Sequence, residues 1–370
     1  MTKIVYSMKS NQFLEGIKIL DLSQYIPGPF ATRQLSDLGA QVIKVEPPDG
    51  DQMRRFMYTG ESETSPVYKH LNRGKRIIRI DLKSPSGLQD LQHLLKDADV
   101  LLESFRPGVL ERLGLDRATL ESINPRLIHC ALSGYGQTGP YRSRAGHDLS
   151  YCAASGALEF SGTVDKPAIT YPPMADHAGA MQACVCILAA LNSRQISNEG
   201  SYIDVSLFES SLSWQYLSFF QPDNMHSELL LNGGAACYNI YQCSDDYFIS
   251  IAALEPHFWV NFCDAVDKAE WVDAQYETIP QKQLISEVAE LFKQYPRKHW
   301  NKLFKDVDCC YEALLLHKEM SFHPQIAARQ AITQDGPAYP AHINDKTVAL
   351  NIDIFEFKAG EKPEWTSPAQ

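Results

Sequence analysis

Short apolar runs alternate with segments of helical spacing over the first 200 residues. The strand-like runs lie at 17–22, 41–46, 76–82, 99–104 and 126–133. Between them, residues 29–38 and 88–96 repeat apolar side chains at helical intervals, as in Leu88, Leu91 and Leu95. Strands that alternate with helices predict an α/β fold with a parallel sheet and helices on both of its faces.

Two later regions change the pattern. Residues 178–193 form an apolar run without a polar face, which predicts a deeply buried helix. After Trp214, residues 239–253 predict a hairpin that turns at 244–246, and amphipathic helices follow at 283–294 and 298–305. We therefore expect a large domain over 1–224, a smaller α+β domain over 225–330, and a segment over 331–370 that returns to the large domain. A strand within 339–354 is the expected point of return.

Composition and charge narrow the class of protein. Of the 370 residues, 44% are hydrophobic and 21% are charged, which is typical of a globular protein with a sizeable core. The net charge of −11 argues against a general nucleic-acid binder, which would carry a basic face. Local basic clusters at 54–55 and 73–76 still allow an anionic small ligand.

The sequence also bears on location and metals. No run approaches the roughly 20 apolar residues of a membrane span, and residues 1–11 lack the apolar segment of a signal peptide. The nine cysteines, an odd number scattered through apolar runs, predict reduced thiols and hence a cytoplasmic protein. The 11 histidines show no metal-ligand spacing, so no metal is expected.

Two short runs carry the candidate chemistry. One is Gly146-His147-Asp148, and the other is 174–180, whose Asp176 lies 29 positions after His147. A His and an Asp that titrate on either side of neutral can remove a proton from carbon and return another. Each also has a structural interpretation: Asp176 as the N-cap of the apolar helix, and His147 as an ordinary loop residue.

A series of motifs then identifies a family. They are LGAQVIKVEPP at 38–48, NRGKR at 72–76, RPGV at 106–109 and GYGQTGP at 134–140. In this order the chain resembles CoA-transferase family III, the CaiB/BaiF group, and within it the α-methylacyl-CoA racemases, over residues 14–330. The resemblance implies a Rossmann-like large domain, a small domain and an interlocked homodimer. It also implies that acyl-CoA binds between the large domain of one subunit and the small domain of the other. Coenzyme A is then part of the substrate, and no separate cofactor is expected.

The resemblance assigns roles to three side chains. Asp176 matches the catalytic carboxylate, a nucleophile in the transferases and a proton-transfer base in the racemases. His147 matches the second base, and Glu255 matches the carboxylate that orients it, although Glu255 also suits the N-terminus of a helix that begins at Pro256. A backbone N–H at the start of the helix after Asp176 is the expected donor to an enolate oxygen.

The same resemblance points to residues that contact the substrate and CoA. These are Arg54, Ile80, Lys83, Ser104, Phe105, Arg106, Arg112, Gly146, Asp148 and Tyr151. Two positions depart from the racemase pattern. Pro47 stands where racemases often have Arg, which shifts a phosphate contact toward Arg54, and His177 stands beside Asp176 where glycines are usual.

Three functions fit these residues. An α-methylacyl-CoA racemase is favoured, because His147 and Glu255 are both present and the 231–238 run is closer to the racemase form. A family III CoA-transferase that forms an aspartyl-CoA thioester on Asp176 is the alternative. A non-catalytic acyl-CoA-binding protein is the third.

Overall fold

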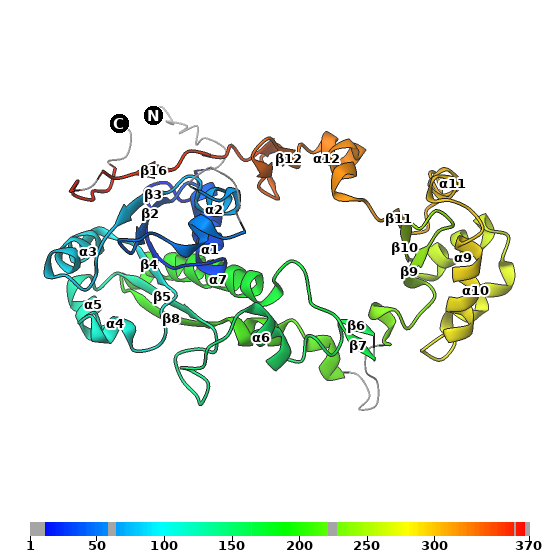
Figure 1. Cartoon of the computed structure of the whole chain (residues 1–370), viewed down its shortest axis with the longest axis horizontal. Helices are drawn as coiled ribbons and strands as arrows, with labels where there is room; N and C mark the ends of the chain where they lie inside the picture. Colours follow the sequence, from blue (N-terminus) through cyan, green and yellow to red (C-terminus); the bar gives the residue numbers. More distant parts are fainter. Residues whose placement is uncertain (1–11, 58–63, 164, 221–227, 359, 367–370) are drawn as a thin grey trace. The chain divides into compact units, whose positions relative to one another are not determined.

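The chain folds into two compact units (Figure 1). The structure is a computed structural model that describes residues 12–57, 64–163, 165–220, 228–358 and 360–366. The larger unit comprises 1–155, 171–214 and 324–370, and the smaller unit comprises 156–170 and 215–323.

A seven-stranded parallel sheet forms the centre of the larger unit, with strand order β16-β3-β2-β1-β4-β5-β8. Its strands are β1 (Lys18–Leu22), β2 (Gln41–Glu46), β3 (Arg76–Arg79), β4 (Val100–Glu103), β5 (Ile128–Ser133), β8 (Ser201–Ser206) and β16 (Phe355–Glu356). The parallel α/β fold expected from the apolar pattern is confirmed. The returning strand is β16, just beyond the predicted 339–354, and β3 ends at Arg79 rather than at residue 82.

Helices cover both faces of this sheet because neighbouring residues on a strand point in opposite directions. Leu20 of β1 shares a core with Leu91 and Leu94 of α3. The next residue, Asp21, accepts a hydrogen bond from Thr32 of α1 on the opposite face. The helices of the larger unit are α1 (Pro27–Asp37), α2 (Pro66–Asn72), α3 (Pro85–Asp97), α4 (Val109–Arg112), α5 (Arg117–Ile123), α6 (Asp148–Ala154), α7 (Met174–Ser197), α8 (Leu207–Ser213) and α12 (Pro324–Ala328).

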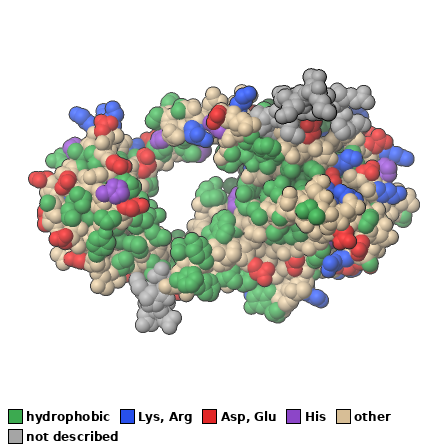
Figure 2. Space-filling view, turned by 180° about the vertical axis from the view of Figure 1, so that it is seen from behind, with side chains coloured by type: hydrophobic (Ala, Val, Ile, Leu, Met, Phe, Trp, Pro, Cys, Tyr) green, Lys and Arg blue, Asp and Glu red, His purple; other side chains and the backbone are tan. Residues whose placement is uncertain are grey.

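The long helix α7 differs from two expectations: that no segment approaches the length of a membrane span, and that this helix is deeply buried. It has 24 residues and contains an 18-residue window with a mean hydropathy of 1.4, so by length and composition alone it could cross a membrane. In the fold it packs against α1, α6, α8, β5 and β8, as a core helix does. It is nevertheless only half buried, and Met181, Val185 and Leu188 are exposed. Figure 2 shows that hydrophobic side chains gather in patches on the surface of both units.

The smaller unit is built around an antiparallel sheet and an aromatic core. Its three-stranded sheet has the order β11-β10-β9, with β9 (Tyr238–Gln242), β10 (Phe248–Ala252) and β11 (Tyr311–Ala313). Helices α9 (Pro256–Ala265), α10 (Lys282–Phe292) and α11 (Arg297–Leu303) complete the unit. Apolar residues of the hairpin and helices form one core, which includes five large aromatic side chains: Trp259, Phe262, Phe292, Trp300 and Phe304.

Three short hairpins lie outside these sheets. They pair β6 (Gly162–Thr163) with β7 (Lys166–Pro167), β12 (Ile332–Thr333) with β13 (Gly336–Pro337), and β14 (His342–Ile343) with β15 (Lys346–Thr347).

Candidate active site

A cavity of about 340 Å³ opens in the larger unit at the carboxyl ends of β1, β4 and β5. Segments that follow these strands form much of its wall: Gln24 and Tyr25 after β1, 104–107 after β4, and 133–135 at the end of β5. The order of the strands reverses between β1 and β4, because the chain first builds β2 and β3 on one side and then crosses to the other. Ligands of open α/β sheets bind at such a switch point.

Asp176 reaches this cavity from the first turn of α7. The helix begins at Met174 with Pro173 at the N-cap position, so the N-cap interpretation of Asp176 is wrong. The backbone N–H of Asp176 donates a hydrogen bond of 3.0 Å to Oδ1 of Asp148. Burial, and then the charge of Asp148, raises the pKa of Asp176 to about 7. A carboxyl group with this pKa is protonated about half of the time at neutral pH.

His147 lines the same cavity from the N-terminus of α6. It occupies the N-cap position, its backbone N–H lies 3.5 Å from Oγ of Ser150, and its side chain is exposed. The imidazole contacts Tyr25 edge to face, with ring centroids 5.7 Å apart. One cavity therefore holds both an imidazole and a carboxyl group, two kinds of side chain that serve as general acids and bases.

Tyr151 holds the loop that carries His147. Its hydroxyl donates a 2.6 Å hydrogen bond to the carbonyl oxygen of Gly146, and its ring lies against both Gly134 and Gly146. A Cβ on Gly134 would lie 2.4 Å from the hydroxyl oxygen, and one on Gly146 would lie 2.7 Å from a ring carbon. Both positions therefore require glycine for this packing. Burial, and then the charge of Asp176, raises the pKa of Tyr151 to about 12, so its hydroxyl stays protonated.

The cavity brings together about half of the residues expected at the site. Those that line it are Ser104, Phe105, Arg106, Gly146, His147, Tyr151 and Asp176, and Asp148 joins them through its hydrogen bond to Asp176. Four expected residues of the larger unit lie outside its wall: Arg54, Ile80, Lys83 and Arg112. Ile80 is buried in the core beside α3, whereas Lys83 and Arg112 are exposed.

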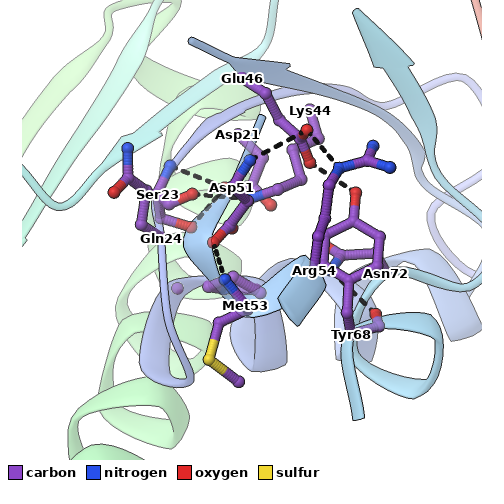
Figure 3. Close-up of polar contacts among 12 residues, drawn as sticks. Asp21, Ser23, Gln24, Lys44, Glu46, Asp51, Met53, Arg54, Tyr68 and Asn72 are labelled. Carbon is purple, nitrogen blue, oxygen red and sulfur yellow. Dashed lines mark hydrogen bonds and ion pairs between the residues drawn. The ribbon is translucent and has the colours of Figure 1, made fainter. Parts of the chain in front are cut away.

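Arg54 belongs to a buried network of charges (Figure 3). Its Nε donates to Oε2 of Glu46 at 2.7 Å, its Nη1 to Oε1 of Glu356 at 2.9 Å, and its guanidinium group lies over the ring of Tyr68. Lys44 joins the network through Oδ2 of Asp51 at 3.0 Å. These partners already neutralise the Arg54 side chain, which is 9% exposed.

Glu255 belongs to the smaller unit. It is exposed at the N-cap position of α9, with Pro256 as the first helical residue. Among the described residues, its carboxylate makes no capping hydrogen bond to the helix. Glu255 therefore occupies the expected N-cap position, but its side chain does not cap the helix.

His177 is not part of the cavity wall. Its Nδ1 lies 2.6 Å from the carbonyl oxygen of Pro173, and its ring packs edge to face on Phe30 of α1, with centroids 4.9 Å apart. The expectation that an imidazole here perturbs Asp176 is not reflected in the causes of the raised pKa, which are burial and Asp148. The expected donor to an enolate oxygen was a backbone N–H at the start of a helix after Asp176. The helix instead begins at Met174, before Asp176, and the N–H of Asp176 already donates to Asp148.

Several cavity residues were missed from the sequence. They are Gln24, Tyr25, Tyr135, Arg142 and Arg144. Three of them could have been predicted from their position, because ligands bind at the carboxyl ends of parallel strands. Gln24 and Tyr25 follow the first predicted strand, and Tyr135 follows the fifth. The search of the described residues finds no group of three or more His, Cys, Asp or Glu side chains placed to hold a metal ion.

Comparison with known proteins agrees with this geometry. The model of CoA-transferase family III matches residues 14–358. The chain is 33% identical to the α-methylacyl-CoA racemase of Mus musculus, over 89% of this chain and 84% of the relative. It is 32% identical to the succinyl-CoA:glutarate CoA-transferase of Homo sapiens, over 85% of this chain and 74% of the relative. The solved structure of a CAIB/BAIF family protein from Brucella suis superposes with a TM-score of 0.78 at 28% identity, over 92% of this chain and 95% of that one. The chain therefore belongs to CoA-transferase family III.

Proposed function

We propose that the protein is a racemase or epimerase that inverts the α-carbon of 2-methylacyl-CoA thioesters. The observation that carries the proposal is that Asp176 and His147 line one cavity while the pKa of Asp176 is about 7. Inversion requires one group to accept a proton and another to supply one, and each group must hold the opposite role in the reverse reaction. A carboxyl group that titrates near neutral pH suits both roles.

The reaction needs no bond to the enzyme. One of the two groups accepts the α-proton, and the electron pair of the broken C–H bond forms the C=C bond of a thioester enolate. The other group then donates its own proton to the opposite face of the carbon. The enolate returns to a thioester of inverted configuration, and one proton has passed to the enzyme while another has left it.

The alternative is a CoA-transferase, in which Asp176 attacks the thioester carbonyl. This reaction requires the ionised carboxylate as nucleophile. The raised pKa of Asp176 leaves both its acid form and its ionised form populated at neutral pH, which suits a group that accepts a proton in one direction and donates one in the other. The racemase and transferase relatives are nearly equally similar to this chain, so direct assay decides between the two reactions.

Other parts of the proposal concern binding and assembly. We propose that Arg106, at the exposed edge of the cavity, binds a CoA phosphate, and that Glu255 supports His147 in its proton transfer. A homodimer is proposed because α7 exposes Met181, Val185 and Leu188, apolar side chains that a second copy would cover. Sedimentation of the purified protein at the mass of a single chain would contradict the dimer.

A cytoplasmic location is also proposed, because no disulfide joins any of the nine cysteines, all of which lie among the described residues, and seven of them are buried. Fractionation that finds the protein in an oxidising compartment would contradict this location.

The decisive experiment incubates the protein with one epimer of a 2-methylacyl-CoA in D₂O, with and without a free carboxylic acid as acceptor. Racemisation predicts deuterium at the α-carbon and the appearance of the other epimer without any acceptor. A new acyl-CoA formed only with the acceptor, without α-deuterium, would replace the racemase by the transferase. Binding without either reaction would favour the non-catalytic alternative.

Two variants separate the reactions further. Asp176→Ala is expected to abolish both reactions. His147→Ala is expected to abolish racemisation, whereas a transferase that relies on Asp176 would survive this change. Lys96→Ala, which alters an exposed residue in the last turn of α3 outside the cavity wall, is the control for losses caused by handling or folding.

A further inference from the structure

We propose that Asp148 is a positioning residue for Asp176: its carboxylate fixes the first turn of α7 and places a negative charge against the catalytic carboxyl group. The inference deepens the proposed function and rests on it for the catalytic consequence. Asp148 was expected to contact the substrate, but the structure gives its side chain a different partner.

The geometry is the first part of the argument. Oδ1 of Asp148 accepts the backbone N–H of Asp176 at 3.0 Å, although the two residues are 28 positions apart in the chain. This N–H belongs to the first turn of α7, where backbone donors have no acceptor within the helix. Asp148 thus caps α7 from a neighbouring helix, in the place where Pro173 has no side-chain acceptor to offer.

The other oxygen of Asp148 is also held. The thiol of Cys152, one turn further along α6, lies 3.7 Å from Oδ2. Asp148 is the first residue of α6, where the helix dipole favours a negative charge. The two contacts, one to each carboxylate oxygen, hold the Asp148 side chain in one orientation.

The electrostatic consequence follows from the surroundings of Asp176. Burial makes the largest contribution to the raised pKa of Asp176, and the negative charge of Asp148 makes the second. The remaining charged or titratable side chains on the cavity wall are Tyr25, Arg106, Tyr135, Arg142, Arg144, His147 and Tyr151. Among the described residues, no ion pair joins any of these to Asp176, so no cation offsets the effect of Asp148.

Charged groups on the other elements packed against α7 have partners or positions elsewhere. Arg33 of α1 pairs with Asp37, His129 of β5 lies near Glu103, and Asp204 of β8 accepts the N–H of Gln137. Glu209 of α8 and His177 of α7 itself are not on the cavity wall. Asp148 is therefore the group through which the protein tunes the proton affinity of Asp176.

The test separates the charge of Asp148 from its hydrogen bond. Asp148→Asn keeps an oxygen that accepts the N–H of Asp176 but removes the negative charge, and Asp148→Ser is a second neutral variant. Asp116→Asn is the matched control, because Asp116 also accepts a backbone N–H at a helix start, from Thr119 at 2.8 Å, outside the cavity.

Two readouts are measured on the full-length protein. The first is the protonation of Asp176, followed by the infrared C=O band of its acid form in difference spectra against Asp176→Asn, without substrate. The second is the pH profile of α-deuterium exchange into a 2-methylacyl-CoA.

We expect the midpoint for Asp176 to fall by about 1 pH unit or more in Asp148→Asn, because a nearby like charge disfavours the ionised carboxylate and the substitution removes that charge. The limb of the exchange profile that depends on Asp176 should move to lower pH by the same amount. Asp116→Asn should move neither. A merely structural role would lower the rate without moving the profile.

An unchanged midpoint in folded Asp148→Asn and Asp148→Ser would overturn the inference. A shifted midpoint without exchange in any variant, including the unmodified protein, would support the role of Asp148 and overturn the racemase. The two failures are therefore distinguishable.

Discussion

Two carboxyl groups in the larger unit, the fully buried Asp21 and the partly buried Asp176, have pKa values that shift in opposite directions. Burial raises the pKa of Asp21, but the charges of Lys75 and Lys44 lower it. Together with the hydrogen bonds to Asp21, they outweigh burial, so its pKa lies well below the usual range. Burial also raises the pKa of Asp176, and Asp148 then adds to the increase instead of opposing it. Burial alone therefore does not decide the charge of a carboxyl group, because the sign of its neighbours does.

The partners of Asp21 show why its charge is stable. Nζ of Lys75 donates to Oδ2 of Asp21 at 3.0 Å, and also to Pro29 and Asn72 at 3.0 Å each. Thr32 and Ser23 complete the set of donors to Asp21. This group ties β1, α1 and the start of β3 together, and it has no part in the cavity wall. Asp176 lacks such compensation, and this difference makes it available for proton transfer.

The largest expected effect concerns activity at Asp176. Asp176→Asn should reduce α-deuterium exchange by about 100- to 10,000-fold, the usual contribution of a general acid or base. The fold should persist, because the amide removes a carboxyl group that is unfavourable when ionised and buried. The measurement is deuterium incorporation by mass spectrometry, with circular dichroism as the check on folding. Exchange at the unmodified rate would remove Asp176 from the mechanism.

The second effect concerns stability at Asp21. Lys75→Met should lower the free energy of unfolding by about 3–5 kcal/mol, because it leaves Asp21 as a buried charge without its nearest cation. Urea denaturation at pH 7 measures the change. Lys83→Met, which alters an exposed lysine, serves as the control and should change stability by less than about 0.5 kcal/mol. Equal losses of unfolding free energy in Lys75→Met and Lys83→Met would mean that the pairing of Lys75 with Asp21 does not stabilise the fold.

The third effect is the pH dependence that Asp176 adds to stability. Its pKa rises from 3.8 to about 7 on folding, so the folded state binds its proton more tightly than the unfolded state. This contribution to stability is fully present below about pH 4 and is lost as the pH rises through 7.

Asp176→Asn removes that dependence, so its advantage over the unmodified protein should grow by about 2–4 kcal/mol between pH 4 and pH 8. Urea denaturation of both proteins at several pH values in this window provides the measurement. A difference that stays constant with pH would mean that Asp176 has an ordinary pKa in the folded protein.

The smallest effect removes one donor from Asp21. Thr32→Val deletes the hydroxyl that donates a 2.6 Å hydrogen bond to Oδ2, while the shape of the side chain is kept. We expect a loss of about 1–3 kcal/mol in the free energy of unfolding and unchanged exchange activity. A fall in activity at preserved stability would show that the paired network and the cavity are coupled.

The sequence predicted the central sheet well because its strands are short, apolar and bounded by turns. The β2 strand matches the predicted range 41–46, and the alternation with helices was sufficient for the parallel fold. The prediction for 178–193 was less accurate, since periodicity reports the apolar character of α7 but not whether another part of the protein covers it. Only half of the apolar window of this helix is buried within the described part of the chain.

The candidate residues divide in the same way. The motifs and the family resemblance indicated His147 and Asp176, and both line the cavity. Arg54 was expected at the substrate, but Glu46 and Glu356 already bind it, and Glu356 is 302 positions away in the chain. No local pattern reveals such a partner.

The sequence by itself determined the α/β fold, the family and the two residue types of the proton transfer, because these depend on local periodicity and on motifs of a few residues. Only the tertiary structure decided which charges are neutralised. The contacts of Asp148 with Asp176 and of Lys75 with Asp21 join segments 28 and 54 positions apart. A carboxyl group's acidity depends on burial and on neighbouring charges within a few ångströms, and both are set by the folded chain.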